Sequence, residues 1–113
     1  MRSKIKHVEF PVFVNYSVHV EVTDDIKRSM QKYEQTKNVP FGDDTLAITV
    51  HVEDNGLSFM FLPYGGPVGI IAHESWHVIK RMMDYLGVEL DSETVAYHLG
   101  YLVEKVFNFR GSK

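Results

Sequence analysis

Two histidines and a glutamate stand close together in the run His73-Glu74-Ser75-Trp76-His77. If the run is helical, His73 and His77 are four residues apart, so both imidazoles project from one face and can reach one metal ion. Glu74 lies about 100° round the helix from His73, beside such an ion without being forced to bind it. A general base for metal-bound water occupies that position. The spacing therefore predicts a zinc site with Glu74 as its base, against the plainer alternative of a chance pattern on an amphipathic helix.

A hydrolytic zinc site commonly has three protein ligands and keeps a fourth position for water, so one ligand must come from elsewhere. The chain contains no cysteine, which leaves nitrogen and oxygen ligands. Asp84 is seven residues beyond His77, about 10 Å along the helix axis, and cannot share the ion. We choose Glu93, in the first turn of the next helix, because an antiparallel return would bring it beside the histidines. His98 is the alternative.

The sequence also supplies a helix to hold the motif. Pro67 suits the first turn of a helix, and Gly87 suits its end, where glycine readily adopts a left-handed conformation. These signals predict a helix over about 67–86. Asp91 then offers a capping side chain for a last helix, which an apolar stripe extends over about 92–108.

The residues before the motif favour strands. Periodicity predicts strand structure over 4–22, in which Pro11 marks either an edge position or a bend between two short strands. A helix over 26–35 and strands over 46–53 and 57–62 follow. Asp54-Asn55-Gly56 is typical of a tight primed hairpin turn between the last two strands. The order of elements predicts a single α+β domain over 1–113, with helices on one face of a small, mostly antiparallel sheet.

Several residues outside the motif have two interpretations. Tyr97, one turn after Glu93, is a candidate donor to the oxyanion of a reaction intermediate, or a structural tyrosine between the last two helices. Gly100 is expected to let those helices approach closely. His19 and His51 alternate with valines, which indicates exposed strand positions rather than a second metal site.

Charge and hydropathy exclude some classes of protein. The formal net charge is −3, and the basic pairs Lys27-Arg28 and Lys80-Arg81 are isolated on expected helix surfaces, which argues against nucleic-acid binding. Solvated helix faces explain both pairs. No segment approaches the ~20 apolar residues of a membrane span, and no apolar stretch after Met1 suits a secretion signal. We therefore expect a cytoplasmic protein with no membrane partner.

The motif and the residues after it resemble a known family. His73 to His77 followed by Glu93-Thr94-Val95-Ala96-Tyr97 resembles the gluzincin branch of zinc metallopeptidases, in which two histidines on one helix and a glutamate on the next bind zinc. The thirty residues from His73 to Leu102 resemble small proteins of bacteriophages and prophages that are named as metallopeptidases. The resemblance implies His73, His77 and Glu93 as ligands of one zinc ion, Glu74 as the base, and a zincin-like motif helix preceded by a small sheet. We do not expect the large second lobe of thermolysin-like enzymes within these 113 residues.

The expected function is therefore that of a small zinc metallopeptidase, a hydrolase acting on a peptide or protein substrate in the cytoplasm of a bacterial host. The alternative is a non-catalytic zinc-binding phage or prophage protein that binds a partner. The presence of Glu74 favours the enzyme, because a structural zinc site needs no base and closes its fourth position. A metal-free interaction module, whose stability chelation would not change, is a third hypothesis. Iron, cobalt or nickel can use the same ligands, and peptidoglycan amides are an alternative substrate.

Overall fold

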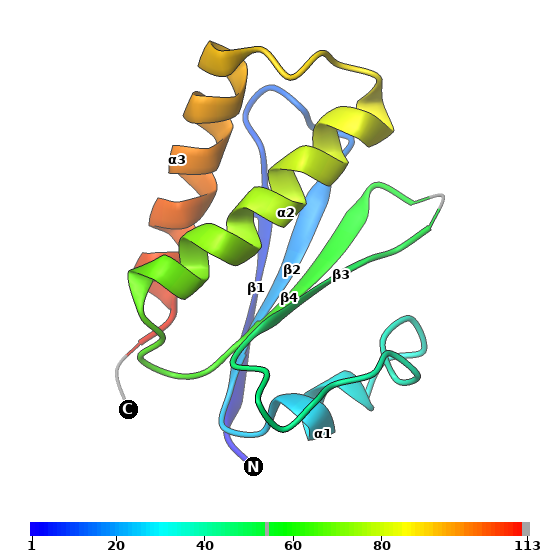
Figure 1. The fold of residues 1–113 in the computed structure, drawn as a ribbon, viewed down its shortest axis with the longest axis vertical. Coiled ribbons are helices and arrows are strands. Elements are labelled where there is room, and N and C mark those ends of the chain that lie inside the picture. Colours follow the sequence, from blue (N-terminus) through cyan, green and yellow to red (C-terminus); the bar gives the residue numbers. More distant parts are fainter. Residues whose placement is uncertain (54, 112–113) are drawn as a thin grey trace.

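The chain folds into a four-stranded sheet with helices against it (Figure 1), in a computed structural model that describes residues 1–53 and 55–111. Its elements, in chain order, are β1 (Ser3–Glu9), β2 (Ser17–Thr23), α1 (Ile26–Met30), β3 (Ile48–His51), β4 (Leu57–Leu62), α2 (Val68–Leu86) and α3 (Ser92–Phe109). The strand order is β1-β2-β4-β3, in which β2 and β4 are parallel and the other two pairs are antiparallel. The predicted α+β fold, with a mostly antiparallel sheet and a C-terminal helix, is confirmed.

One face of the sheet packs against α2 and α3. Val18 and Val20 of β2 are fully buried on this face, together with Ile71 and Ile79 of α2 and Leu102 of α3. Burial of each such side chain stabilises the fold by roughly 1.5–3 kcal/mol. Within the layer, α3 contacts β1, whereas α2 contacts β4 and β3, so α2 is the helix next to the β3 end of the sheet (Figure 1).

The opposite face carries a second core, which includes Met30 of α1, Val50 of β3, and Phe59 and Phe61 of β4. The expectation that all helices share one face is therefore correct for α2 and α3 and wrong for α1. The sequence of β4 explains why both faces are covered. Its apolar side chains run without alternation from Phe59 to Leu62, as in a strand that is buried on both sides.

The first helix is shorter than predicted. It ends at Met30, whereas periodicity placed its end near Gln35. Side chains compete with the helix here: the Thr36 hydroxyl donates to the Met30 carbonyl at 2.6 Å, and the Tyr33 hydroxyl donates to Glu21 at 2.6 Å. Because these bonds hold the chain in successive turns, Tyr33 contributes to the second core without a continued helix.

The predicted hairpin of β3 and β4 is confirmed, with His51 opposite Ser58, but its tight primed turn is wrong. Asp54 lies outside the described residues, and Gly56 does not adopt the positive φ that such a turn requires. Glycine is needed there for another reason. A Cβ at Gly56 would stand 2.1 Å from the carbonyl oxygen of Asn15 in the loop between β1 and β2.

The two long helices have the predicted boundaries. Pro67 precedes α2, and Gly87 ends it with φ of 68°. Asp91 caps α3 by accepting a hydrogen bond from the backbone N–H of Glu93. The expected close approach of helices at Gly100 is wrong, because a Cβ there would meet nothing within 4 Å. In the described part of the chain, no helix combines the length and the apolar character needed to cross a bilayer.

Candidate active site

His73 and His77 meet on the exposed face of α2. Their Nε2 atoms are 3.2 Å apart, and their rings are nearly perpendicular, with an interplanar angle of 82°. Two imidazole nitrogens that bind one tetrahedral zinc ion at about 2.0–2.1 Å lie roughly 3.3 Å apart. The His73 side chain is 69 % exposed, so an ion from solvent can reach it. The pair therefore fits two ligand positions of a zinc site.

The carboxylate of Glu74 lies beside this pair and is anchored by the sheet. The Thr49 hydroxyl of β3 donates to Oε1 of Glu74 at 2.7 Å, and Oε2 is 3.9 Å from Nε2 of His73. Glu74 is 8 % exposed, so the carboxylate has little freedom to turn away. Alternation along β3 explains the contact: Val50 points into the second core, and Thr49 therefore points toward α2. Glu74 has the position of a base without acting as a ligand.

His51, two residues after Thr49, faces the same helix. Its Nδ1 is 3.0 Å from the Ser58 hydroxyl, which is 2.5 Å from the Tyr16 hydroxyl. Burial raises the pKa of Tyr16, so that hydroxyl keeps its proton, although the hydrogen bond with Ser58 and the charge of Arg81 act in the opposite direction. Burial also lowers the pKa of His51, as do the charges of Arg81 and His77, which favours a neutral ring.

The contact with Ser58 bears on the tautomer of His51. When the Ser58 hydroxyl is the donor to Nδ1, the proton of the neutral ring is on Nε2. His51 is exposed, as alternation predicted, and its ring also contacts Ser58 on the strand next to it.

A groove of about 630 Å³ joins these elements. Its lining residues come from β3, from the second half of α2 and from the loop after α2: His51, His77, Lys80, Arg81, Asp84, Val88 and Leu90. The prediction that Lys80-Arg81 forms a solvated helix face is wrong for Arg81, whose side chain is 24 % exposed. Because the groove includes His77, it is continuous with the candidate metal position.

Glu93 and Tyr97 lie elsewhere. Both line a shallow hollow against Val12 and Phe13 in the loop between β1 and β2, and Tyr97 is 57 % exposed. Figure 1 shows the start of α3 beside this loop, across α2 from β3. Within residues 1–53 and 55–111, no group of three or more His, Cys, Asp or Glu side chains could hold a metal ion. Two predicted ligands are therefore together, and the third, Glu93, stays a prediction.

The fallback ligand His98 is also away from the pair. It is 3 % exposed, its Nδ1 donates to the Thr94 carbonyl at 2.8 Å, and its ring stacks on Phe13 at a centroid distance of 4.7 Å. These contacts make His98 part of the packing between α3 and the loop of residues 10–16.

His19 belongs to a polar cluster on the opposite face of the sheet. It is 7 % exposed, which corrects the expectation of a surface position. Its ring lies 3.1 Å from a His7 nitrogen and 3.4 Å from Oε1 of Glu21. Burial raises the pKa of Glu21, but hydrogen bonds from Lys32 and Tyr33 outweigh burial and hold the pKa below its ordinary range. The cluster joins β1, β2 and the segment after α1.

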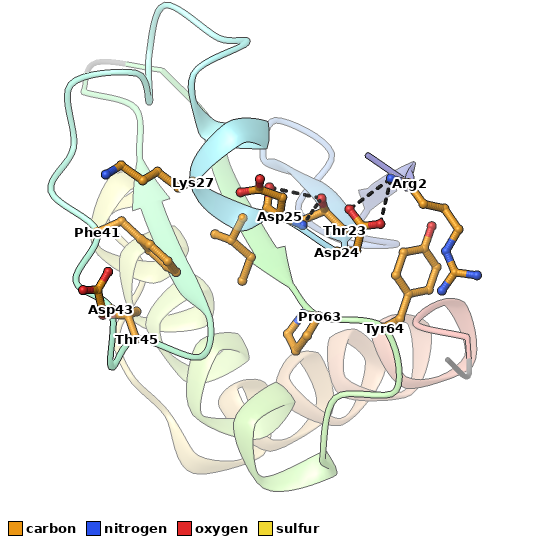
Figure 2. Close-up of a pocket in the computed structure, with 11 residues that line it drawn as sticks. Arg2, Thr23, Asp24, Asp25, Lys27, Phe41, Asp43, Thr45, Pro63 and Tyr64 are labelled. Atoms are coloured by element: carbon orange, nitrogen blue, oxygen red, sulfur yellow. Dashed lines mark hydrogen bonds between the residues drawn. The ribbon is translucent and has the colours of Figure 1, made fainter.

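A second hollow, of about 530 Å³, lies near the start of α1 (Figure 2). Two of its acidic side chains are engaged locally: Asp24 accepts from the backbone N–H of Arg2 at 3.0 Å, and Asp25 caps α1 by accepting from the backbone N–H of Arg28. The Arg2 guanidinium stacks on the Tyr64 ring at 3.9 Å. These contacts serve the turn and the chain ends, so this hollow is a weaker candidate than the groove beside α2.

Comparisons with protein-family models, with curated proteins and with solved structures find no match for this chain. The candidate site therefore rests on its own geometry. Its most informative features are the pair of Nε2 atoms and the adjacent carboxylate that β3 holds.

Proposed function

We propose that this protein is a small zinc-dependent metallopeptidase, in which His73 and His77 hold the metal and Glu74 is the general base. One observation supports this proposal above others: three motif side chains converge, with two Nε2 atoms 3.2 Å apart and an anchored carboxylate beside them. An arrangement that only braced two helices would not need the carboxylate or the hydroxyl of Thr49 that orients it.

The side chains of the protein divide the work of amide hydrolysis. Zinc, when bound, supplies Lewis-acid chemistry and makes its water more acidic. Glu74 accepts the proton from the attacking water and returns it to the leaving amine. Thr49 fixes one carboxylate oxygen, so the other stays directed toward the histidines. The Nε2–H of His51, in the groove that contains His77, donates to the substrate carbonyl oxygen as negative charge develops on it.

His51 is better situated for that donation than Tyr97, the residue proposed from the sequence. His51 and His77 line the same groove, whereas Tyr97 lines the hollow near Phe13. The row through Ser58 to Tyr16 also fixes the ring of His51, which reduces the reorganisation needed during reaction.

The edge strand β3 is the proposed binding site for the substrate backbone. β3 pairs with β4 on one side only, and β3 lies next to α2. An extended peptide can therefore add to the free edge through backbone hydrogen bonds, with its side chains directed alternately toward the groove and away from it. This geometry would bring a peptide carbonyl to the histidine pair.

The third ligand needs its own test. The resemblance to gluzincins implies Glu93, which lies in the hollow at the start of α3. Coordination by Glu93 would require this end of α3 to move toward His73 and His77. The variant Glu93→Ala therefore separates a site that recruits Glu93 from one completed without it.

The decisive experiment is elemental analysis of purified protein, combined with a peptide-library cleavage assay. We expect one zinc per chain in the wild type, none in His73→Ala or His77→Ala, and a higher melting temperature before chelation than after. Glu74→Gln should retain zinc and lose cleavage by at least about 100-fold. A wild type that takes up no zinc when it is offered, with an unchanged melt after chelation, would refute the proposal. Zinc binding without cleavage would instead support a binding protein.

A further inference from the structure

The groove between β3 and α2 concentrates positive charge in a chain whose net charge is −3. Lys80 and Arg81 line it, and Asp84 is the one carboxylate among its lining residues. Lys80 makes no ion pair with any described residue. Val88 and Leu90 supply an apolar wall, which partly excludes water from the groove. The lower local dielectric strengthens the attraction between its positive charges and an anion.

Neighbouring side chains position the guanidinium of Arg81, but they do not use all of its hydrogen-bond donors. The guanidinium lies 5.7 Å from the centroid of the Tyr85 ring, and its positive charge opposes the burial that raises the pKa of Tyr16. Its Nη1 is 3.7 Å from Oδ2 of Asp84, which is longer than a hydrogen bond. Its Nε is buried without an acceptor among the described residues. The side chain is 24 % exposed, so the terminal nitrogens rather than Nε are the donors for the two oxygens of a carboxylate.

The spacing along α2 says where on a substrate that carboxylate would be. Arg81 is four residues after His77, about 6 Å along the helix axis. An extended peptide advances about 3.3 Å per residue, and a side-chain or terminal carboxylate reaches a few ångströms further. When a peptide carbonyl is at the histidine pair, the carboxylate of the adjacent residue is therefore within reach of Arg81.

We infer that the groove is a specificity site for a carboxylate on the residue next to the cleaved bond, held by Arg81 with support from Lys80. This inference rests on the proposed function, because the histidine pair defines where the substrate carbonyl lies. Two sources share the chemistry: the side chain of an acidic residue, and the free C-terminus of a peptide.

Binding of three short peptides distinguishes these sources. The probes are acetyl-Ala-Ala-Glu-amide, acetyl-Ala-Ala-Gln-amide and acetyl-Ala-Ala-Gln with a free C-terminus. Dissociation constants are measured by NMR titration of the purified protein, in the Glu74→Gln background so that no peptide is consumed, and again on chelated wild type. We expect at least one carboxylate-bearing peptide to bind about tenfold more tightly than the neutral one, as a charge-assisted hydrogen bond would give.

Matched variants assign the preference to the groove. Arg81→Gln should abolish the tenfold preference, and Lys80→Gln, a change at an exposed position, should reduce it about threefold. Arg81→Lys keeps the charge without the fork and should retain part of the preference. Lys105→Gln, an exposed lysine of α3, should leave it unchanged. NMR spectra and thermal melts verify that each variant is folded.

Two results would overturn the inference: equal binding of all three peptides, or a preference that survives both Arg81→Gln and Lys80→Gln. A preference for one charged peptide over the other supports it and names the source of the carboxylate. Because peptide binding is also measured on chelated protein, the carboxylate preference can be interpreted even if the protein binds no zinc or cleaves no peptide. Loss of the proposed function and loss of the carboxylate site are therefore separate outcomes.

Discussion

Replacing Thr49 by valine tests the contact on which the proposed base depends. The substitution keeps the branched shape of the side chain and removes the hydroxyl that donates to Oε1 of Glu74 at 2.7 Å. Hydrogen bonds to charged groups contribute about 1.5–3 kcal/mol, and the lower figure applies because Thr49 is only partly buried. A loss of about 1.5 kcal/mol in a domain of this size lowers the melting temperature by roughly 5–8 °C.

A double-mutant cycle attributes this loss to the pair. Thr49→Val, Glu74→Ala and the double variant are compared in urea denaturation, and we expect a coupling free energy of about 1–1.5 kcal/mol. Thr49→Ser, which retains a hydroxyl, is the matched control and should remain close to wild type. In the cleavage assay, a base that has lost its anchor should slow the reaction about tenfold.

The refuting result is equally specific. If Thr49→Val unfolds within about 0.3 kcal/mol of wild type and the coupling is zero, the contact does not orient Glu74 and the argument for an anchored base fails. The zinc content of Thr49→Val should equal that of the wild type, because the hydrogen bonds of the Thr49 hydroxyl go to Glu74 and not to the expected ligands. Loss of zinc in this variant would mean that β3 acts on the ligands rather than on the base.

Two further predictions concern the scaffold. Glu21→Gln should lower the free energy of unfolding at neutral pH by about 1–2 kcal/mol, a figure limited by the 38 % exposure of Lys32, its partner. Burial raises the pKa of Glu21, but its hydrogen bonds hold it below the ordinary 4.5, so this stabilisation exists above pH 4.5 and is lost as the pH falls through the lowered value. Urea melts of wild type and variant should therefore converge as the pH falls below the lowered pKa of Glu21, and a constant difference would contradict the reasoning. Gly56→Ala should destabilise the protein by several kcal/mol, because the new Cβ would stand 2.1 Å from the carbonyl oxygen of Asn15. Gly100→Ala should stabilise it by about 1 kcal/mol, because a Cβ at Gly100 would meet nothing within 4 Å. Similar shifts of the two variants in thermal melts would refute the distinction.

Local signals in the sequence were enough to predict most of the fold. Pro67, Gly87 and Asp91 define the ends of α2 and α3 because each acts within one turn of the helix it limits. The length of α1 could not be predicted in the same way, since it depends on the contact of Tyr33 with Glu21, a residue on a strand. The prediction of a primed turn at Gly56 was wrong for a similar reason: glycine is required there by the close approach of the loop that contains Asn15, and not by the conformation of the hairpin turn.

In the candidate site, too, contacts within one element were predictable from the sequence and contacts between elements were not. Helical spacing alone predicts that His73 and His77 meet, because both belong to one element. The placement of Glu93 depends on which flank of α2 the last helix covers, and spacing carries no information on that choice. Alternation could show that Thr49 and His51 share a face of β3, but not that this face meets α2.

The register of β3 links the site to the far side of the sheet. Thr49 contacts Glu74 and His51 lines the groove only while Val50 points to the opposite face, and a slip of one residue would reverse all three. Val50 packs with Phe59 and Phe61 in the second core, which α1 and the following turns cover. The site therefore depends on a core that none of its own residues enters, and a destabilised second core should loosen Glu74 before it affects the helical pairing of His73 and His77.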